Sequence, residues 1–257
     1  MSALALRIFA CFCMLLDHLG YALYPFLPFA TVLRCFGRLA FPLFVFLIVN
    51  GYRYSSNRLR YALRLALFAL LSQIPFSLFC GYGFYSLNFN VFVTLLLALL
   101  TVWSTDALLK RKFLRCFAFV PGLLVFLLYY FGLISSDYGM KGIFLALTFR
   151  YLDKNKLLTV LGTFCSVFYA QLIAYGVQVL KLLLGKGAAF SLPSDWVLIQ
   201  GFSLFALIPI FFYNGKRGRF PQKKWAAKAV QWGFYLFYPL HMILLTMLRF
   251  CLWRICG

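Results

Sequence analysis

Residues 4–29 read LALRIFACFCMLLDHLGYALYPFLPF, an apolar run that carries the dipeptide Asp17-His18 near its middle. A run of about 20 apolar residues is long enough for an α-helix to cross the hydrocarbon core of a bilayer. No small-residue cleavage pattern follows it, so we interpret it as a retained first helix and not as a removable signal peptide.

The composition extends this interpretation to the whole chain. Hydrophobic residues make up 64% and charged residues 12%, whereas a soluble domain has about 25% charged residues. Backbone groups in lipid must be satisfied within a helix or a closed barrel, and long apolar runs favour helices. We predict an all-α, polytopic transmembrane bundle that forms a single domain over residues 1–257. Its nine expected helices lie near residues 4–29, 36–50, 60–80, 88–105, 113–133, 138–152, 157–184, 195–213 and 228–253.

Neither the net charge of +20 nor the eight cysteines indicates a soluble function. The basic residues stand between the apolar runs, so we expect no nucleic-acid partner. The cysteines show no C-x-x-C or metal-ligand spacing, and most lie inside apolar runs, where cysteine behaves as a small hydrophobe. We therefore expect no metal site.

Lysine and arginine are concentrated in four connections, residues 51–64, 106–115, 150–156 and 214–228, which hold 17 of the 25 basic residues. All four follow even-numbered helices of the predicted nine. By the positive-inside rule they face the cytoplasm, and the N-terminus is predicted to be cytoplasmic as well. Topology alone explains such charges, so ligand binding by them needs a separate argument.

Few ionisable side chains lie within the apolar runs, and those that do usually face a bundle interior and mark a site. Asp17 and His18 lie about 20 Å along the first helix, toward its outer half. Adjacent helical residues diverge by about 100°, so Asp17 groups with Tyr21 while His18 faces elsewhere. We expect one of the two to hold a neighbouring helix and the other to face a substrate. A purely structural role is the alternative for His18.

Arg38 is the expected ion-pair partner of Asp17. It opens the second predicted helix in Gly37-Arg38-Leu39-Ala40-Phe41-Pro42, one turn before a proline. Snorkelling at the helix end is the alternative. Asp137, at the start of the sixth predicted helix, is expected to cap that helix or to join the Arg38 network, and capping is favoured.

His241 lies halfway along the last predicted helix, where Pro239 is expected to break the hydrogen-bond ladder. An imidazole beside freed backbone groups suits a site, and packing as a polar core residue is the alternative. Asn90 offers neutral hydrogen bonds on the outer side, although a helix cap explains it equally well. The candidate acceptor-binding residues are Tyr21, Asn90, Asp137 and Tyr238.

Basic residues on the predicted cytoplasmic side are candidates for anion binding. The turn Asn214-Gly215-Lys216-Arg217-Gly218 combines two cations with glycines that expose backbone N–H groups. This chemistry suits the phosphates of a nucleotide cofactor and also those of lipid headgroups. The candidate cofactor-binding residues are Arg53, Arg60, Arg64, Asn214, Lys216 and Arg217.

Several sequence blocks occur together and in one order along most of the chain. They are Met14-Leu15-Leu16-Asp17-His18-Leu19-Gly20-Tyr21, Gly37-Arg38-Leu39-Ala40-Phe41-Pro42, Asn50-Gly51-Tyr52-Arg53, Ser72-Gln73-Ile74-Pro75-Phe76, Asn90-Val91-Phe92, Asp137-Tyr138-Gly139, Tyr213-Asn214-Gly215-Lys216-Arg217-Gly218 and Tyr235-Leu236-Phe237-Tyr238-Pro239-Leu240-His241. Together they resemble the TraX family of bacterial membrane proteins, known for N-acetylation of conjugative pilin. That family is similar to the clan of membrane acyltransferases that includes the acyltransferase-3 proteins and heparan-alpha-glucosaminide N-acetyltransferase.

The resemblance implies acetyl transfer from cytoplasmic acetyl-CoA across a bacterial inner membrane. The acceptor would be an amine or hydroxyl of a pilin N-terminus, a glycan or an envelope component on the outer side. We expect His18, by preference over His241, to act as general base or to carry the acyl group as an acyl-imidazole. Asp17 would orient a base or pair with Arg38, and Arg38 or an asparagine N–H would stabilise the oxyanion.

Two other classes of function are consistent with the same residues. A proton-coupled transporter or flippase would use the buried aspartate, histidines and arginine as a relay, and broken helices at Pro42 and Pro239 would suit it. A membrane assembly factor would bind a pilin-like helix without catalysis. The sequence predicts no particular oligomeric state.

Overall fold

The computed structural model of the chain describes residues 1–24, 26–27, 29–82, 88–185, 194–219 and 221–256. Almost all of the elements within these ranges are helical. They are α1 (Ala3–Leu23), α2 (Ala30–Gly37), α3 (Ala40–Tyr54), α4 (Arg58–Cys80), α5 (Val91–Leu109), η1 (Lys112–Phe117), α6 (Val120–Tyr130), α7 (Gly139–Tyr151), α8 (Lys156–Leu183), α9 (Asp195–Gly201), η2 (Phe202–Ala206), α10 (Leu207–Phe211) and α11 (Lys224–Cys256). The exception is a two-residue parallel pair, β1 (Asn88–Phe89) with β2 (Ser135–Ser136).

Seven helical stretches in the described part of the chain are long and apolar enough to cross a membrane. They are α1, α2 continued by α3, α4, α5, η1 continued by α6, α8 and α11. The other two predicted helices are shorter, since α7 has 13 residues and residues 195–213 are divided into α9, η2 and α10. The prediction of an all-α bundle is confirmed, and the protein is a multi-pass membrane protein.

Prolines do not end these helices. α4 continues through Pro75, and α11 continues through Pro239, where the expected gap in the hydrogen-bond ladder follows from the missing N–H of proline. Neighbouring helices, side chains and local backbone adjustments re-satisfy the carbonyl groups that a proline frees within a membrane. The actual break lies elsewhere: the second predicted helix begins early, at Ala30, and turns at Arg38 and Leu39 before α3 begins.

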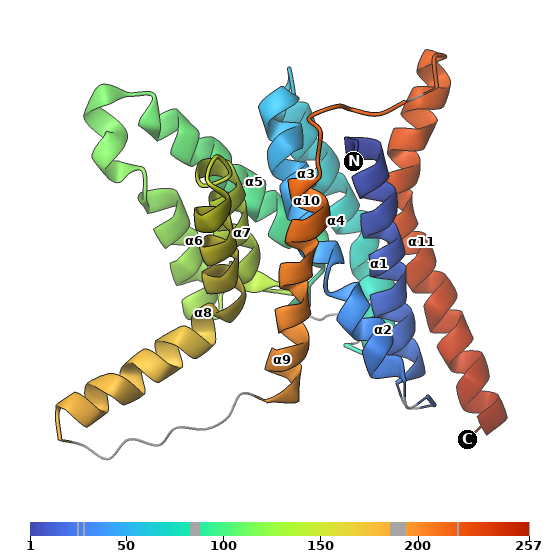
Figure 1. Cartoon of the computed structure of the whole chain (residues 1–257). Helices are drawn as coiled ribbons and strands as arrows, with labels where there is room; N and C mark the ends of the chain where they lie inside the picture. The colour runs from blue at the N-terminus through green and yellow to red at the C-terminus, as the bar shows by residue number, and fades with distance from the viewer. Residues whose placement is uncertain (25, 28, 83–87, 186–193, 220, 257) are drawn as a thin grey trace.

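The bundle is organised around α1, which packs against α2, α3 and α11. α4 contacts both α11 and α5, while α5, α7 and α8 pack in sequence on the other side. The N-terminus and the four basic connections lie together at the upper end in Figure 1, which we call the basic end. The C-terminus lies at the lower end, which we call the opposite end.

α1 and α2 cross at unusually short range because glycine stands at the contact. A Cβ atom added to Gly37 would lie 2.5 Å from Asp17 Cα and 2.7 Å from its backbone N. On the other side of the crossing, a Cβ on Gly20 would lie 2.7 Å from the carbonyl oxygen of Ala30. Small residues that let backbones approach are a common basis for helix association in lipid. This close packing sets the position of α2, and with it the start of α3.

Replacing Gly37 with alanine is expected to destabilise the bundle by about 1–3 kcal/mol, the range found for overpacked interiors. The new methyl group meets backbone atoms, which cannot rotate away. Thermal unfolding of the detergent-solubilised protein measures the effect, with Gly176→Ala as the control, because no atom lies within 4 Å of a Cβ at that α8 position. Equal melting temperatures for the two variants would contradict the packing argument.

Candidate functional site

The expected ion pair between Asp17 and Arg38 is present where α2 meets α3. Arg38 Nη2 donates to Asp17 Oδ2, and the two side chains are 6% and 10% exposed. Arg34 of α2 joins them, with its Nε 3.7 Å from Asp17 Oδ1. Asp17 therefore holds α2 and the start of α3 against α1. In the described part of the chain none of its hydrogen bonds goes to a histidine.

His18 and His241 are in direct contact, although 223 residues separate them in sequence. The Nδ1 atom of His18 lies 2.7 Å from Nε2 of His241, and the ring centroids lie 4.9 Å apart. His241 is 4% exposed, and its Nδ1 lies 2.6 Å from the carbonyl oxygen of Phe237, one turn earlier in α11. The two histidines of the chain thus form one unit between α1 and α11.

The contact with Phe237 determines the protonation of the neutral pair. A carbonyl oxygen only accepts hydrogen bonds, so Nδ1 of His241 carries the proton and Nε2 carries the lone pair. That lone pair accepts the hydrogen bond from Nδ1–H of His18. The remaining lone pair lies on Nε2 of His18, which is the basic atom of the pair. A proton taken up there is shared along a chain that ends at a backbone carbonyl.

Aromatic rings enclose the two histidines. The rings of Phe79 and Tyr238 stand edge-on to His18, at centroid distances of 5.5 and 6.1 Å. Phe237 stacks on His241 at 4.8 Å. Tyr238 is 2% exposed and also meets the ring of Phe92. His241 is buried and His18 is partly buried among these rings, and the low local dielectric strengthens the hydrogen bonds of both imidazoles.

A cavity of about 660 Å³ leads from the basic end toward this pair. It is bounded by residues of α1, α3, α4, α5 and α11, and its size is typical of ligand sites. On α1 its walls run from Ala3 to Met14, about 16 Å along the helix axis. Met14 precedes His18 by one turn, and Tyr238 precedes His241 by three residues. The deep end of the cavity is therefore within one helical turn of both histidines.

Three of the six predicted cofactor-binding residues line this cavity: Arg60, Arg64 and Arg217. Arg7 of α1, which the sequence patterns did not single out, also lines it. Serine and asparagine side chains of residues 55–57 and several tyrosines complete the lining at this level. The result is an opening with four guanidinium groups and an aromatic wall.

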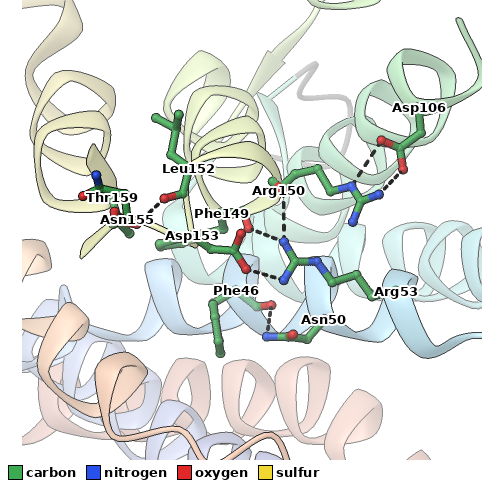
Figure 2. A network of polar contacts seen from close by, with 10 residues as sticks. All are labelled: Phe46, Asn50, Arg53, Asp106, Phe149, Arg150, Leu152, Asp153, Asn155 and Thr159. Atoms are coloured by element: carbon green, nitrogen blue, oxygen red, sulfur yellow. Dashed lines mark hydrogen bonds and ion pairs between the residues drawn. The ribbon is translucent and has the colours of Figure 1, made fainter. Parts of the chain in front are cut away.

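Arg53 lies away from the cavity, in a network that joins α3 to α7 (Figure 2). Its Nη1 lies 2.5 Å from Oδ2 of Asp153, and its Nη2 donates to the backbone carbonyls of Phe149 and Arg150 at the end of α7. The prediction that Arg53 shares one binding site with Arg60 and Arg64 was wrong. The chain reverses direction between α3 and α4, so Arg53 does not line the cavity that the other two arginines line. One carboxylate and two backbone carbonyls already bind the terminal nitrogens of Arg53, whereas its buried Nε has no hydrogen-bond partner among the described residues.

A second ionic junction at the basic end centres on Asp106 of α5 (Figure 2). Arg150 contacts it through Nε at 3.2 Å and Nη2 at 2.8 Å. The hydroxyls of Tyr52 and Tyr151 donate to the same carboxylate, each at 2.9 Å. One buried carboxylate thus ties together α3, α5 and α7.

Asp106→Asn is expected to lower the free energy of unfolding by about 1–3 kcal/mol. The substitution replaces one carboxylate oxygen with an NH₂ group, which cannot accept the hydrogen bonds that Arg150 and the two tyrosines donate. Asp153→Asn is the matched change at the neighbouring junction, where the carboxylate is more exposed and, among the described residues, accepts from Arg53 alone. Thermal unfolding in detergent should rank Asp106→Asn clearly below Asp153→Asn and the parent. The opposite order would show that Asp106 does not hold the junction.

The predicted anion-binding turn at residues 214–218 is partly used by the chain itself. Asn214 N donates to the carbonyl of Met1, and the carbonyls of Lys216 and Arg217 accept from Ala3 and Leu4. Lys216 N donates to the side chain of Asn214. The turn therefore fastens the start of α1 to the α10–α11 connection, and Asn214 and Lys216 are not among the residues that line the cavity.

The predicted acceptor residues do not form one group. Asn90 caps α5 by accepting from Phe92 N, and its amide donates to Gln73 and to the carbonyl of Ala69, so it acts as a structural link to α4. Asp137 does not cap α7, since Tyr138 occupies the N-cap position without a side-chain hydrogen bond. Asp137 lies within electrostatic reach of Arg38, which is the role we ranked second.

Tyr21 and Tyr238 lie on opposite sides of His18 along the bundle axis. Tyr238 closes the deep end of the cavity. Tyr21 lies beyond His18, where the guanidinium groups of Arg34 and Arg249 stand over its ring. The sequence patterns drew attention to neither arginine: Arg34 falls between the predicted helices 4–29 and 36–50, and Arg249 falls within the predicted helix 228–253.

Comparisons with known proteins give a family match and a relative of similar length. A family model described as TraX protein matches residues 2–249. A protein from Dichelobacter nodosus named "Probable fimbrial assembly protein FimC, serogroup H1" is 30% identical over 260 residues, which cover 95% of this chain and 94% of that protein. No solved structure gives a significant match. The family match includes both histidines, the Asp17–Arg38 pair and the four arginines of the cavity.

Proposed function

The chain belongs to the TraX family, and from that premise we propose that it is a membrane acyltransferase that moves an acetyl group from acetyl-CoA to an amine or hydroxyl acceptor. The observation that carries the proposal is the cavity, which runs from four arginines at the basic end to Met14 and Tyr238, each within one helical turn of a histidine of the His18–His241 pair. The arginines suit the phosphates of CoA, and the interior suits its long, narrow pantetheine arm. The basic end would face the cytoplasm, where acyl-CoA is found.

His18 would act as general base through Nε2. As the acceptor nitrogen or oxygen bonds to the thioester carbon, its proton passes to Nε2 of His18. The carbon–sulfur bond then breaks, and the same proton is delivered to the sulfur of the departing CoA. His241 is a positioning residue, because it keeps Nδ1 of His18 protonated and shares the transient positive charge.

Asp17 and Arg38 would support this step indirectly. Their ion pair fixes the rotation of α1, so that His18, the next residue, faces His241 of α11. Pairing with Arg38 was one of the two roles expected for Asp17, whereas orientation of a base by Asp17 and stabilisation of an oxyanion by Arg38 are not part of this proposal. The hydrogen bonds of both groups to each other support the positioning role.

His18→Ala is expected to reduce acetyl transfer by at least about 100-fold, the usual size of a general-base contribution. His241→Ala should reduce it less and alter the pH dependence of kcat, while His241→Gln, whose amide oxygen can accept from Nδ1–H, should restore part of the rate. Radiolabelled acetyl-CoA, purified protein and membrane extract as acceptor source provide the assay. Full turnover by His18→Ala would contradict the mechanism.

Arg60→Gln and Arg64→Gln are each expected to weaken CoA binding about tenfold, which corresponds to about 1.4 kcal/mol. Arg58→Gln is the matched control, because it lies in the same first turns of α4 but stacks on Tyr52 and does not line the cavity. Equilibrium binding of labelled CoA in detergent measures the affinities. An unchanged affinity in the Arg60 and Arg64 variants would place the phosphates elsewhere.

A pilus assembly factor without catalysis is the second candidate, and the name of the Dichelobacter nodosus relative supports it. The same name also supports a pilin-like acceptor for an acyltransferase. Substitution of a histidine distinguishes the two candidate functions, because an assembly factor would tolerate His18→Ala and would release no free CoA. An acyltransferase would lose both pilus function and CoA release in that variant.

A further inference from the structure

Two arginines from different helices share one tyrosine ring near the opposite end of the bundle. The guanidinium carbon of Arg34 in α2 stands 5.2 Å from the centroid of the Tyr21 ring, and that of Arg249 in α11 stands 5.7 Å from it. The ring itself belongs to α1. Cation–π contacts of this length are attractive, and a ring that serves two cations brings their charges close together.

This cluster lies beyond the histidine pair as seen from the cavity. Tyr21 follows His18 by three residues, about 4.5 Å along α1, whereas the cavity ends on the other side at Met14. The Phe79 ring bridges the two places, because its centroid is 5.5 Å from that of His18 and 5.3 Å from that of Tyr21. His18 therefore stands between the cavity and the arginine cluster.

Positive charge exceeds negative charge in this region, where Arg34, Arg38 and Arg249 stand against the two carboxylates of Asp17 and Asp137. Asp17 serves both Arg38 and Arg34. Among the described residues Arg249 contacts no carboxylate within ion-pair distance, and its Nη1 donates to the carbonyl of Phe79 at 3.4 Å. An arginine that merely snorkelled from the end of α11 would turn toward water or headgroups, whereas Arg249 turns inward to Tyr21 and Phe79. Excess cations in a low-dielectric region are stabilised by a bound anion.

We propose that Arg34, Tyr21 and Arg249 form a binding site for a phosphate or carboxylate group, and that this group belongs to the acyl acceptor. Arginine forks match the paired oxygens of such groups. An anionic group held there would place a neighbouring amine or hydroxyl at Nε2 of His18, on the side away from the CoA cavity. The assignment to the acceptor rests on the proposed function, whereas the binding of an anion does not.

The test is thermal unfolding of the purified full-length protein without acyl-CoA. One arm adds glycerol phosphate to protein in phosphatidylcholine nanodiscs, with glycerol as the uncharged control. The other arm replaces part of the phosphatidylcholine with phosphatidylglycerol. We expect the melting temperature of the parent to rise with at least one anion and not with glycerol.

Arg249→Gln is the decisive variant, because it leaves the Asp17 ion pairs intact. It should weaken the anion effect at least tenfold in half-saturating concentration, while Arg254→Gln, an exposed arginine one turn later in the same helix, should not. An effect of glycerol phosphate identifies a soluble phosphate, and an effect of phosphatidylglycerol alone identifies a lipid headgroup; either supports the site. No effect in the parent, or an equal effect in Arg249→Gln, overturns it.

The outcome is separable from that of the proposed function. His18→Ala should keep the full anion effect, since the site does not include His18. If acetyl transfer fails in every protein while Arg249→Gln still loses the anion effect, the acyltransferase proposal falls and the anion site stands. If transfer proceeds and no anion effect exists, only the site falls.

Discussion

The buried ion pair between Asp17 and Arg38 is the interaction on which the arrangement of the N-terminal half depends. Each partner is buried at a depth where an unpaired charge is costly, and removal of one partner of such a pair typically costs about 3–5 kcal/mol. The pair forms only because Gly37 lets α2 approach the backbone of α1 at this point. It thereby fixes the break between α2 and α3 and the rotation of α1. Adjacent residues of a helix face about 100° apart, so Asp17 facing α2 turns His18 toward α11.

The position of His18 divides the bundle into two functional parts. On one side lies the cavity with its four arginines, and on the other lies the arginine cluster around Tyr21. Two ligands that approached from opposite ends would meet at the imidazole, and neither would need to pass the other. Such a division suits transfer of a group across a membrane better than it suits movement of a whole substrate, because the aromatic rings of Phe79, Tyr238 and Phe237 surround the histidine pair.

The sequence predicted the fold class and the residues of the pair, and physical reasons explain what it missed. An unpaired aspartate in lipid carries a high free-energy cost, so the sequence predicts that Asp17 forms an ion pair with the nearby cation Arg38. That His18 meets His241 did not follow, because periodicity shows which face of a helix is polar and not which helices are neighbours. Arg34 was missed because the second helix was predicted to begin only at residue 36, whereas α2 begins at Ala30.

The remaining errors concern charged residues whose surroundings depend on where helices begin and end. Arg53 and Arg60 are seven residues apart, yet they belong to different helices on either side of a reversal, and of these two only Arg60 lines the cavity. Asp106 and Asp153 received no role because carboxylates beside basic loops are usually solvated, although here they tie α3, α5 and α7 together. The Asp137 cap failed because the N-cap position of α7 falls on Tyr138.

We expect acyl-CoA to occupy the cavity between α1, α4 and α11 with its thioester beside the histidine pair. Photo-crosslinking with a CoA derivative that carries a diazirine in its acyl group, followed by mass spectrometry, tests this most directly. The account predicts labels near Met14, Phe92 and Tyr238, at the deep end of the cavity, that disappear in excess acetyl-CoA. Labels confined to the 106–115 connection or the lipid-facing surface of α6, or labels that acetyl-CoA does not displace, would contradict it.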